Sequence, residues 1–141
     1  MYSTARKAID TYAQVGVETG VASADPHKLI LMLFDGTLAA IGSARHAMGR
    51  SEIAAKGAAI TKAIEIIDGG LKASLDVKAG GVLAERLSQL YDYMLNRLLA
   101  ANLRNDVAIL DEVARLLNEL RGAWAQIGQG ADALASEAGV K

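Results

Sequence analysis

The sequence predicts an all-α protein, folded as an antiparallel up-down four-helix bundle. Three observations support this prediction. The 141 residues include one proline, only 4% of them are aromatic, and apolar residues recur every three or four positions over long stretches. A β-sandwich of this length would need many turns and more β-branched and aromatic residues. Alanine and leucine, which favour helices, dominate the composition instead.

The first 22 residues are expected to form a short mobile cap. Ile9, Tyr12 and Val15 recur among polar neighbours, but the pattern is too short for a stable isolated helix. A strong helix start follows. Asp25 or Ser23 can accept hydrogen bonds from the first turn, and Pro26 fits a position whose N–H has no partner. The first long helix therefore begins here and runs to about residue 48.

The second helix is expected over residues 52–76. Its apolar residues step by three or four positions, a period of about 3.5. Gly69 and Gly70 lie inside this helix, where each costs about 1 kcal/mol of helix propensity. Two interpretations stay open: a neighbouring helix packs closely against the glycines, or a partner's backbone approaches them.

Two further helices complete the predicted bundle. Residues 77–81 break the pattern, and a third helix is expected over residues 82–103. Asn105 and Asp106 can cap a fourth, over residues 107–127, with Trp124 in its apolar seam as a structural residue. Residues 128–141 lack a seam and are expected to be disordered. The bundle domain would then span residues 23–127, with short connections between antiparallel neighbours.

Composition argues against several classes of function. The net charge of −1 gives no broad basic surface for nucleic acid. The absence of cysteine excludes disulfides and thiolate chemistry. No apolar run approaches the roughly 18 residues of a membrane span, and the first residues lack the apolar core of a secretory signal. A cytoplasmic protein without membrane insertion is therefore expected.

Candidate residues for catalysis or metal binding are few. His27 and His46 lie about five turns apart on one helix and are interpreted as surface histidines. Asp76 and Asp92 have no partner nucleophile or base and are interpreted as solvated or hydrogen-bonded helix residues. No zinc or di-iron spacing and no phosphate-binding loop is present. The sequence supports no enzyme, metal site or cofactor.

Apolar residues exceed what one seam per helix requires. The excess includes Met32, Ile66, Tyr91, Tyr93, Leu99, Ile109 and Leu116. Exposed apolar grooves usually mark partner sites, often for an amphipathic helix. The groove is predicted along the second and third helices, and several of its six candidates must be core: Ile66, Leu71, Leu75, Leu83, Leu87 and Tyr91. From periodicity alone a helix-binding module, a self-associating bundle, and a cofactor bundle or enzyme stay open.

Several blocks of sequence, in order, resemble a known family. They include Ser23-Ala24-Asp25-Pro26-His27-Lys28-Leu29, Leu90-Tyr91-Asp92-Tyr93-Met94 and Ala101-Asn102-Leu103-Arg104-Asn105-Asp106. Together, at this spacing, they resemble the flagellar secretion chaperone family FliS. Two positions depart from the family pattern. Phe34 stands where the family often has tyrosine, and Val82 where glutamate commonly follows the paired glycines.

The resemblance implies a cytoplasmic chaperone without catalysis, nucleotide or metal. It would bind the C-terminal segment of flagellin, which is unfolded when free, and so prevent premature polymerisation. It would also deliver flagellin to the export-gate membrane protein of the flagellar type III export apparatus. Ile9 and Tyr12 match the apolar pair that makes this contact, and with Val15 they build the cap. Some similar proteins contact flagellar regulators. A self-associating structural bundle remains the alternative, and a homodimer stays open.

Overall fold

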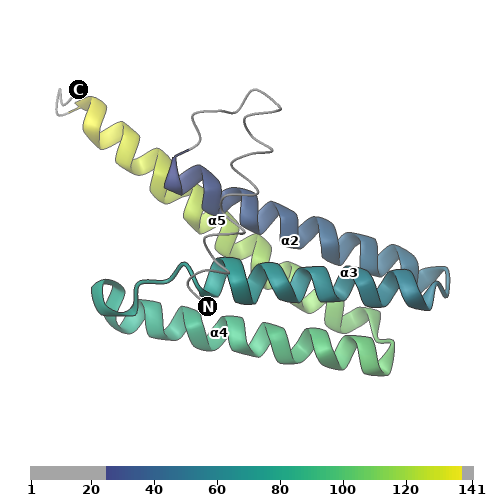
Figure 1. The fold of residues 1–141 in the computed structure, drawn as a ribbon. Coiled ribbons are helices and arrows are strands. Elements are labelled where there is room, and N and C mark those ends of the chain that lie inside the picture. The colour runs from purple at the N-terminus through teal and green to yellow at the C-terminus, as the bar shows by residue number, and fades with distance from the viewer. Residues whose placement is uncertain (1–24, 138–141) are drawn as a thin grey trace.

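A computed structural model describes residues 25–137, and the side chains of residues 25–127 within that range. Its elements are α2 (Pro26–Gly49), α3 (Ile53–Ile66), the π-helix η1 (Ile67–Lys72), α4 (Val77–Arg104) and α5 (Val107–Glu137) (Figure 1). No strand occurs among the described residues. The prediction of an all-α four-helix bundle is confirmed. The predicted cap over residues 1–22 lies outside the described residues.

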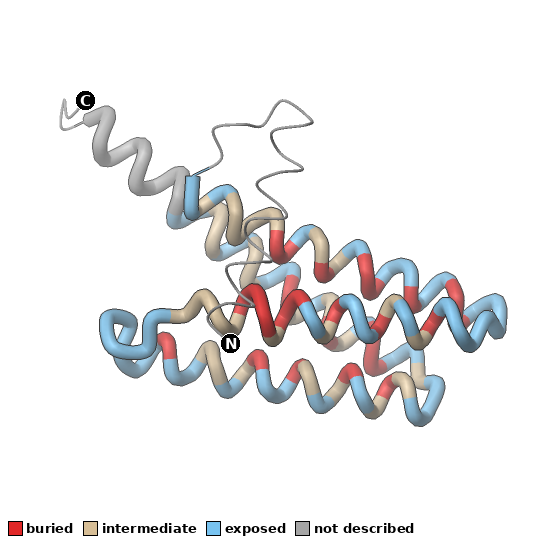
Figure 2. Tube along the Cα trace, viewed as in Figure 1, coloured by how far each residue is buried: buried red, intermediate tan, exposed pale blue. Residues whose placement is uncertain are grey.

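The four long helices pack around one core. α2 contacts α3 and α5, while α4 contacts α5 and the combined α3–η1 element. Short connections make chain neighbours antiparallel, as the ribbon shows (Figure 1). Buried residues recur along the inward side of each helix (Figure 2). The largest fully buried apolar side chains are Leu33, Ile60, Ile67, Met94, Leu98, Leu110, Leu117 and Val113.

The predicted start of the first long helix is confirmed. The Asp25 side chain accepts a hydrogen bond from the Lys28 backbone N–H at 2.9 Å, and Pro26 occupies the first turn. This arrangement satisfies one of the N–H groups that a helix start leaves without an intrahelical partner. Because Ser23 lies outside the described residues, Asp25 is the cap that the structure shows.

The prediction of one continuous helix over residues 52–76 is wrong. The α-helix ends at Ile66, and the π-helix η1 follows it to Lys72. A π-turn holds more residues than an α-turn, so it changes which side chains face the core. Gly69 and Gly70 are both buried in η1. A Cβ atom on Gly70 would lie 3.1 Å from Leu33 Cδ2, which supports the interpretation of close helix packing.

The predicted break at residues 77–81 is a kink within α4. Gly81 has φ 56° and ψ −134°, a conformation that side chains with a Cβ rarely adopt. The helix begins earlier than predicted, at Val77, because the Asp76 carboxylate accepts a hydrogen bond from the Ala79 N–H at 3.0 Å. Asp92 accepts a hydrogen bond from Lys72 at 2.6 Å. Both aspartates are therefore hydrogen-bonded helix residues, as interpreted from the sequence.

α5 runs to Glu137, so the predicted helix end at residue 127 is wrong. The sequence of residues 128–137 contains several alanines and no proline, and this composition allows a helix to continue without an apolar seam. At the start of α5, the Asp106 carboxylate accepts a hydrogen bond from the Ala108 N–H at 3.0 Å. This contact agrees with the predicted cap.

The interpretation of His27 as a surface histidine is wrong. The His27 ring is half-buried and stacks on Trp124, with ring centroids 4.9 Å apart. The Trp124 indole N–H donates to the His27 carbonyl at 3.0 Å, and His27 Nε2 donates to the Trp124 carbonyl at 2.6 Å. Sequence reasoning missed this pair because 97 positions separate the two residues. His46 is exposed, as predicted.

Replacing Gly70 with valine should destabilise the bundle by about 1–3 kcal/mol, because the new side chain overpacks against Leu33. Gly57→Val is the matched control, since no atom lies within 4 Å of a Cβ at Gly57. Urea denaturation measures both variants. Equal stability changes at the two positions would contradict close packing at Gly70.

Trp124→Ala should lower stability by about 2–3 kcal/mol, less than the roughly 3–5 kcal/mol of a fully buried tryptophan. Trp124 is half-buried and joins α5 to the start of α2. Ile127→Ala, at a position 61% exposed on the same helix, should change stability by no more than about 0.5 kcal/mol. Thermal unfolding compares the two. If Trp124→Ala lowered stability as little as Ile127→Ala, the contact between Trp124 and the start of α2 would contribute nothing.

Candidate partner-binding surface

The six groove candidates do not form one exposed surface. Ile66, Leu71 and Tyr91 are buried core residues, with exposed fractions of 7%, 2% and 4%. Leu75 and Leu87 are half-buried and pack against the core. Only Leu83 is fully exposed. The prediction counted apolar residues beyond one seam per helix as accessible, whereas Ile66 and Tyr91 of that excess are buried.

The buried position of Tyr91 also affects its hydroxyl group. Burial raises the pKa of Tyr91 to about 12. Tyr91 is therefore a packed core residue in the described structure. Most of the exposed large apolar side chains among the described residues lie elsewhere on α3 and α4.

Accessible apolar side chains lie on α3 and α4, and two of them, Ile53 and Leu103, line one pocket between these helices. We call this surface the α3–α4 seam and define it as Ile53, Ile64, Leu95, Leu99 and Leu103. Three of these are exposed: Ile53 by 75%, Leu99 by 52% and Leu103 by 87%. The other two are half-buried and pack against the core. Exposed apolar side chains that gather in a row are typical of partner sites.

Sequence reasoning identified only part of this seam. Leu99 was among the apolar residues in excess, but neither Ile53 nor Leu103 was named as a groove candidate. The available signal was the spacing of Leu95, Leu99 and Leu103, which places them four residues apart on one stripe of α4. That stripe runs beside the core residues of the same helix.

Side-chain size explains why the seam is open. α2 presents a stripe of Leu33, Ala40, Ala44 and Ala47, and Leu33 lies against Gly70 of η1. The stripe therefore faces α3 and η1. Its small side chains allow α3 to approach α2 closely, and these two helices share the most extensive contact in the bundle. Of the adjacent long helices, α3 and α4 have the least contact.

Two lysines bridge α4 to the α3–η1 element at opposite ends of the seam. Lys72 of η1 donates to Asp92 at 2.6 Å, and Lys56 of α3 donates to the Asn102 carbonyl at 3.1 Å. Asp92 and Asn102 lie on the same side of α4 as Leu95 and Leu99 by helical spacing. Ile64, Leu95 and Leu99 therefore lie between the two polar contacts, while Ile53 and Leu103 lie beyond the Lys56 contact, at that end of the seam.

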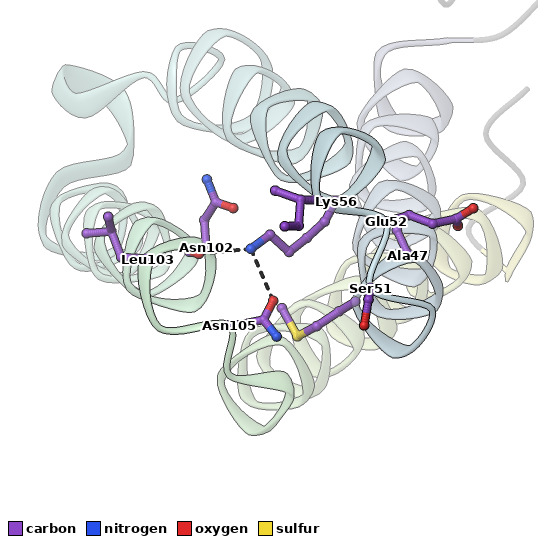
Figure 3. Close-up of a pocket in the computed structure, with 9 residues that line it drawn as sticks. Ala47, Ser51, Glu52, Lys56, Asn102, Leu103 and Asn105 are labelled. Carbon is purple, nitrogen blue, oxygen red and sulfur yellow. Dashed lines mark hydrogen bonds between the residues drawn. The ribbon is translucent and has the colours of Figure 1, made fainter.

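A pocket of about 240 Å³ lies at the Lys56 end of the seam (Figure 3). Ile53, Met48 and Leu103 supply apolar lining, while Lys56 and Asn105 supply polar groups. Lys56 is only 6% exposed, and its ammonium donates to Asn105 Oδ1 at 3.1 Å. Asn105 ends α4 in the left-handed conformation (φ 53°, ψ 47°), which asparagine tolerates better than most residues.

The opposite side of α4 is closed by polar contacts. The Tyr93 hydroxyl and Arg97 Nε both donate to the Glu112 carboxylate of α5, the latter at 2.8 Å. The hydrogen bond from Tyr93 has the larger effect on Glu112. Together with the one from Arg97, it holds the pKa of Glu112 below its usual range. Tyr93, counted among the excess apolar residues, therefore joins α4 to α5.

The side chains that the structure describes contain no group of three His, Asp or Glu residues placed to hold a metal ion. Over the described range, no helix combines the length and the apolar character that crossing a bilayer requires.

Comparison with known proteins supplies the family. The family model described as "Flagellar protein FliS" matches residues 8–131. The chain belongs to the FliS family. It is 55% identical over 119 residues to the flagellar secretion chaperone FliS of Salmonella typhimurium, covering 84% of this chain and 88% of the relative. It is 48% identical over 120 residues to the flagellar secretion chaperone FliSB of Pseudomonas aeruginosa, covering 85% and 94%.

A third relative agrees. The chain is 45% identical over 120 residues to the flagellar secretion chaperone FliS of Escherichia coli, covering 85% of this chain and 88% of the relative. The resemblance inferred from ordered sequence blocks is therefore confirmed. The family-model match over residues 8–131 spans both helices of the α3–α4 seam.

Acid should weaken the bundle partly through Glu112. Because its folded-state pKa is lowered, its stabilisation is present above the ordinary glutamate pKa of about 4.3 and is lost as pH falls through the lowered value. Glu112→Gln should cost no more than about 1 kcal/mol at pH 7, since the pair is partly exposed. Urea unfolding between pH 3 and pH 7 should show a flatter pH dependence for this variant.

Glu119→Gln, at an exposed position of the same helix, is the control for Glu112→Gln. It should keep the pH dependence of the unaltered chain. If Glu112→Gln kept that dependence as well, the hydrogen bonds from Tyr93 and Arg97 would contribute nothing to acid stability.

Proposed function

We propose that this chain is a cytoplasmic export chaperone that binds the disordered C-terminal segment of flagellin. It prevents premature polymerisation and delivers flagellin to the flagellar type III export apparatus. Membership in the FliS family, whose relatives are named flagellar secretion chaperones, supports the export role. The observation that carries the binding role is the α3–α4 seam, an accessible apolar row on a bundle whose core is otherwise closed.

The seam has the dimensions of a helix-binding surface. At about 1.5 Å per residue, the stripe from Leu95 to Leu103 spans about 12 Å, roughly two turns of a ligand helix. An amphipathic helix would lay its apolar side chains along this stripe and against Ile53 and Ile64. A disordered segment that folds on binding needs such apolar burial, because it loses conformational entropy when it orders.

Mixing the chain with flagellin tests this function directly. Intact flagellin should form a stable complex in size-exclusion chromatography and calorimetry, whereas flagellin without its last few dozen residues should not. The alternative is a structural bundle that associates with itself through the same seam. A chain that forms oligomers and ignores flagellin would overturn the chaperone proposal in favour of that alternative.

The N-terminal segment completes the proposal. Ile9, Tyr12 and Val15 lie outside the described residues, and we propose that they form a detachable cap. Ile9 and Tyr12 would contact the cytoplasmic domain of the export-gate membrane protein. Contact with flagellar regulators belongs to the same proposal.

Charged substitutions on the seam should separate binding from stability. Leu99→Asp or Leu103→Asp should weaken binding of the flagellin segment at least tenfold, about 1.4 kcal/mol, because a carboxylate would be buried under the ligand. Stability should change by no more than about 0.5 kcal/mol at these exposed sites. Calorimetric titration and urea unfolding measure the two quantities.

Two control variants are compared with the seam variants. Ile127→Asp, 61% exposed on α5, should alter neither quantity. Leu71→Ala should cost about 2–5 kcal/mol of stability, because Leu71 is core. If affinity fell only in proportion to stability across all four variants, the seam would not be a separate binding surface.

The double variant Ile9→Ala/Tyr12→Ala should weaken binding of the export-gate cytoplasmic domain about tenfold or more, by loss of two apolar anchors. Flagellin affinity should change much less. Pull-down with each partner measures both effects. If the double variant lost binding to both partners equally, Ile9 and Tyr12 would not act at a separate site.

A further inference from the structure

Lys56 is a buried cation without an acidic partner in the described structure. Its side chain is part of the core-facing side of α3 and only 6% exposed. None of the ion pairs among the described residues includes it. Burying an ammonium group is costly unless hydrogen bonds and opposite charge compensate it. A compensating charge in the neighbouring pocket would therefore be favourable.

The α4 terminus supplies only part of this compensation. Lys56 Nζ donates to the Asn102 carbonyl and to Asn105 Oδ1, both at 3.1 Å. The C-terminal end of a helix carries partial negative charge, so the ammonium is favourably placed there. An ammonium has three N–H donors, and the third has no partner among the described residues. The pocket that Lys56 lines lies beside this group (Figure 3).

The carboxylate nearest in sequence does not neutralise Lys56. Glu52 lines the same pocket, but its carboxylate pairs with Arg50 at 3.6 Å. Figure 3 shows Glu52 directed away from Lys56, whose amine points toward Asn105. The pocket thus combines one buried positive group with the apolar side chains of Ile53 and Leu103.

We propose that this pocket binds an acidic side chain of the client segment, together with the apolar side chain next to it on the ligand helix. The identity of the client rests on the proposed function. The pocket volume of about 240 Å³ suits side chains of a polypeptide, because pockets for small molecules usually measure roughly 300–1,000 Å³. Its rim residues, Ile53 and Leu103, also belong to the α3–α4 seam.

The carboxylate gives the complex its register. Apolar contacts along the seam are non-directional, so a ligand helix could slide by one turn with little loss. A charge-assisted hydrogen bond to Lys56 Nζ depends on distance and direction. One acidic residue at the correct position would therefore fix where the ligand helix lies.

A small probe tests the pocket without any client. Isovalerate, a branched aliphatic carboxylate, should shift the NMR signals of the Asn102 and Asn105 side-chain amides and the Leu103 methyls in a saturable way. Isovaleramide, its neutral analogue, should bind at least tenfold more weakly. Lys56→Met should remove this difference, and Lys62→Met, at an exposed position of α3, should keep it. Equal binding of acid and amide, or shifts elsewhere only, would overturn the proposed site.

A double-mutant cycle then tests the client. Each Asp and Glu of the flagellin C-terminal segment is changed singly to its amide, and affinity is measured for the unaltered chain and for Lys56→Met. One of these flagellin substitutions should weaken binding to the unaltered chain about tenfold. The same substitution should have no effect on binding to the Lys56→Met variant. If the segment binds but no acidic residue couples to Lys56, this inference fails while the chaperone function stands. If Lys56→Met does not fold, the comparison of acid and amide on the unaltered chain still decides.

Discussion

The close approach of α2 and α3 is the constraint on which the rest of the structure depends. The stripe of α2 that faces α3 and η1 carries the small residues Ala40, Ala44 and Ala47. Leu33, the larger residue of this stripe, packs against Gly70 of η1. Beside this stripe, Phe34, Ile41 and Met48 recur at intervals of seven residues and are also buried. The α2–α3 pair is thus tightly packed, whereas α3 and α4 make less contact with each other.

This asymmetry leaves the α3–α4 seam accessible. Because α3 packs closely against α2, α4 makes more contact with η1 than with α3. Lys72 and Lys56 hold α4 in place at the two ends. The seam residues remain available to a ligand, while the core beneath them is buried. A chaperone for a disordered segment needs this combination, because a stable fold must coexist with an unfilled apolar surface.

The sequence predicts the architecture well because helix periodicity and capping are local. The start at Asp25, the break near Gly81 and the cap at Asp106 all follow from residues within one turn of each other. Several of the failures share one cause, which is that tertiary contacts decide them. The π-helix at Gly69 and Gly70 forms where α2 approaches.

The same cause explains two other misses. The stacking of His27 on Trp124 joins residues far apart in the chain. The candidate site was only partly predicted, because apolar residues beyond one seam per helix, such as Ile66 and Tyr91, were assigned to a groove although tertiary packing buries them in the core. The cap residues Ile9, Tyr12 and Val15 lie outside the described structure and stay a prediction.

Methyl NMR of the complex tests the central claim most directly. The isoleucine, leucine and valine methyls of the chain would be observed while the flagellin C-terminal segment is added. We expect the methyl signals of Ile53, Ile64, Leu99 and Leu103 to shift strongly and to show contacts with the ligand. The methyl signals of Ile127 and Val107 of α5 should not shift. Contacts confined to α5 and the outer side of α2, with the seam methyls unchanged, would contradict it.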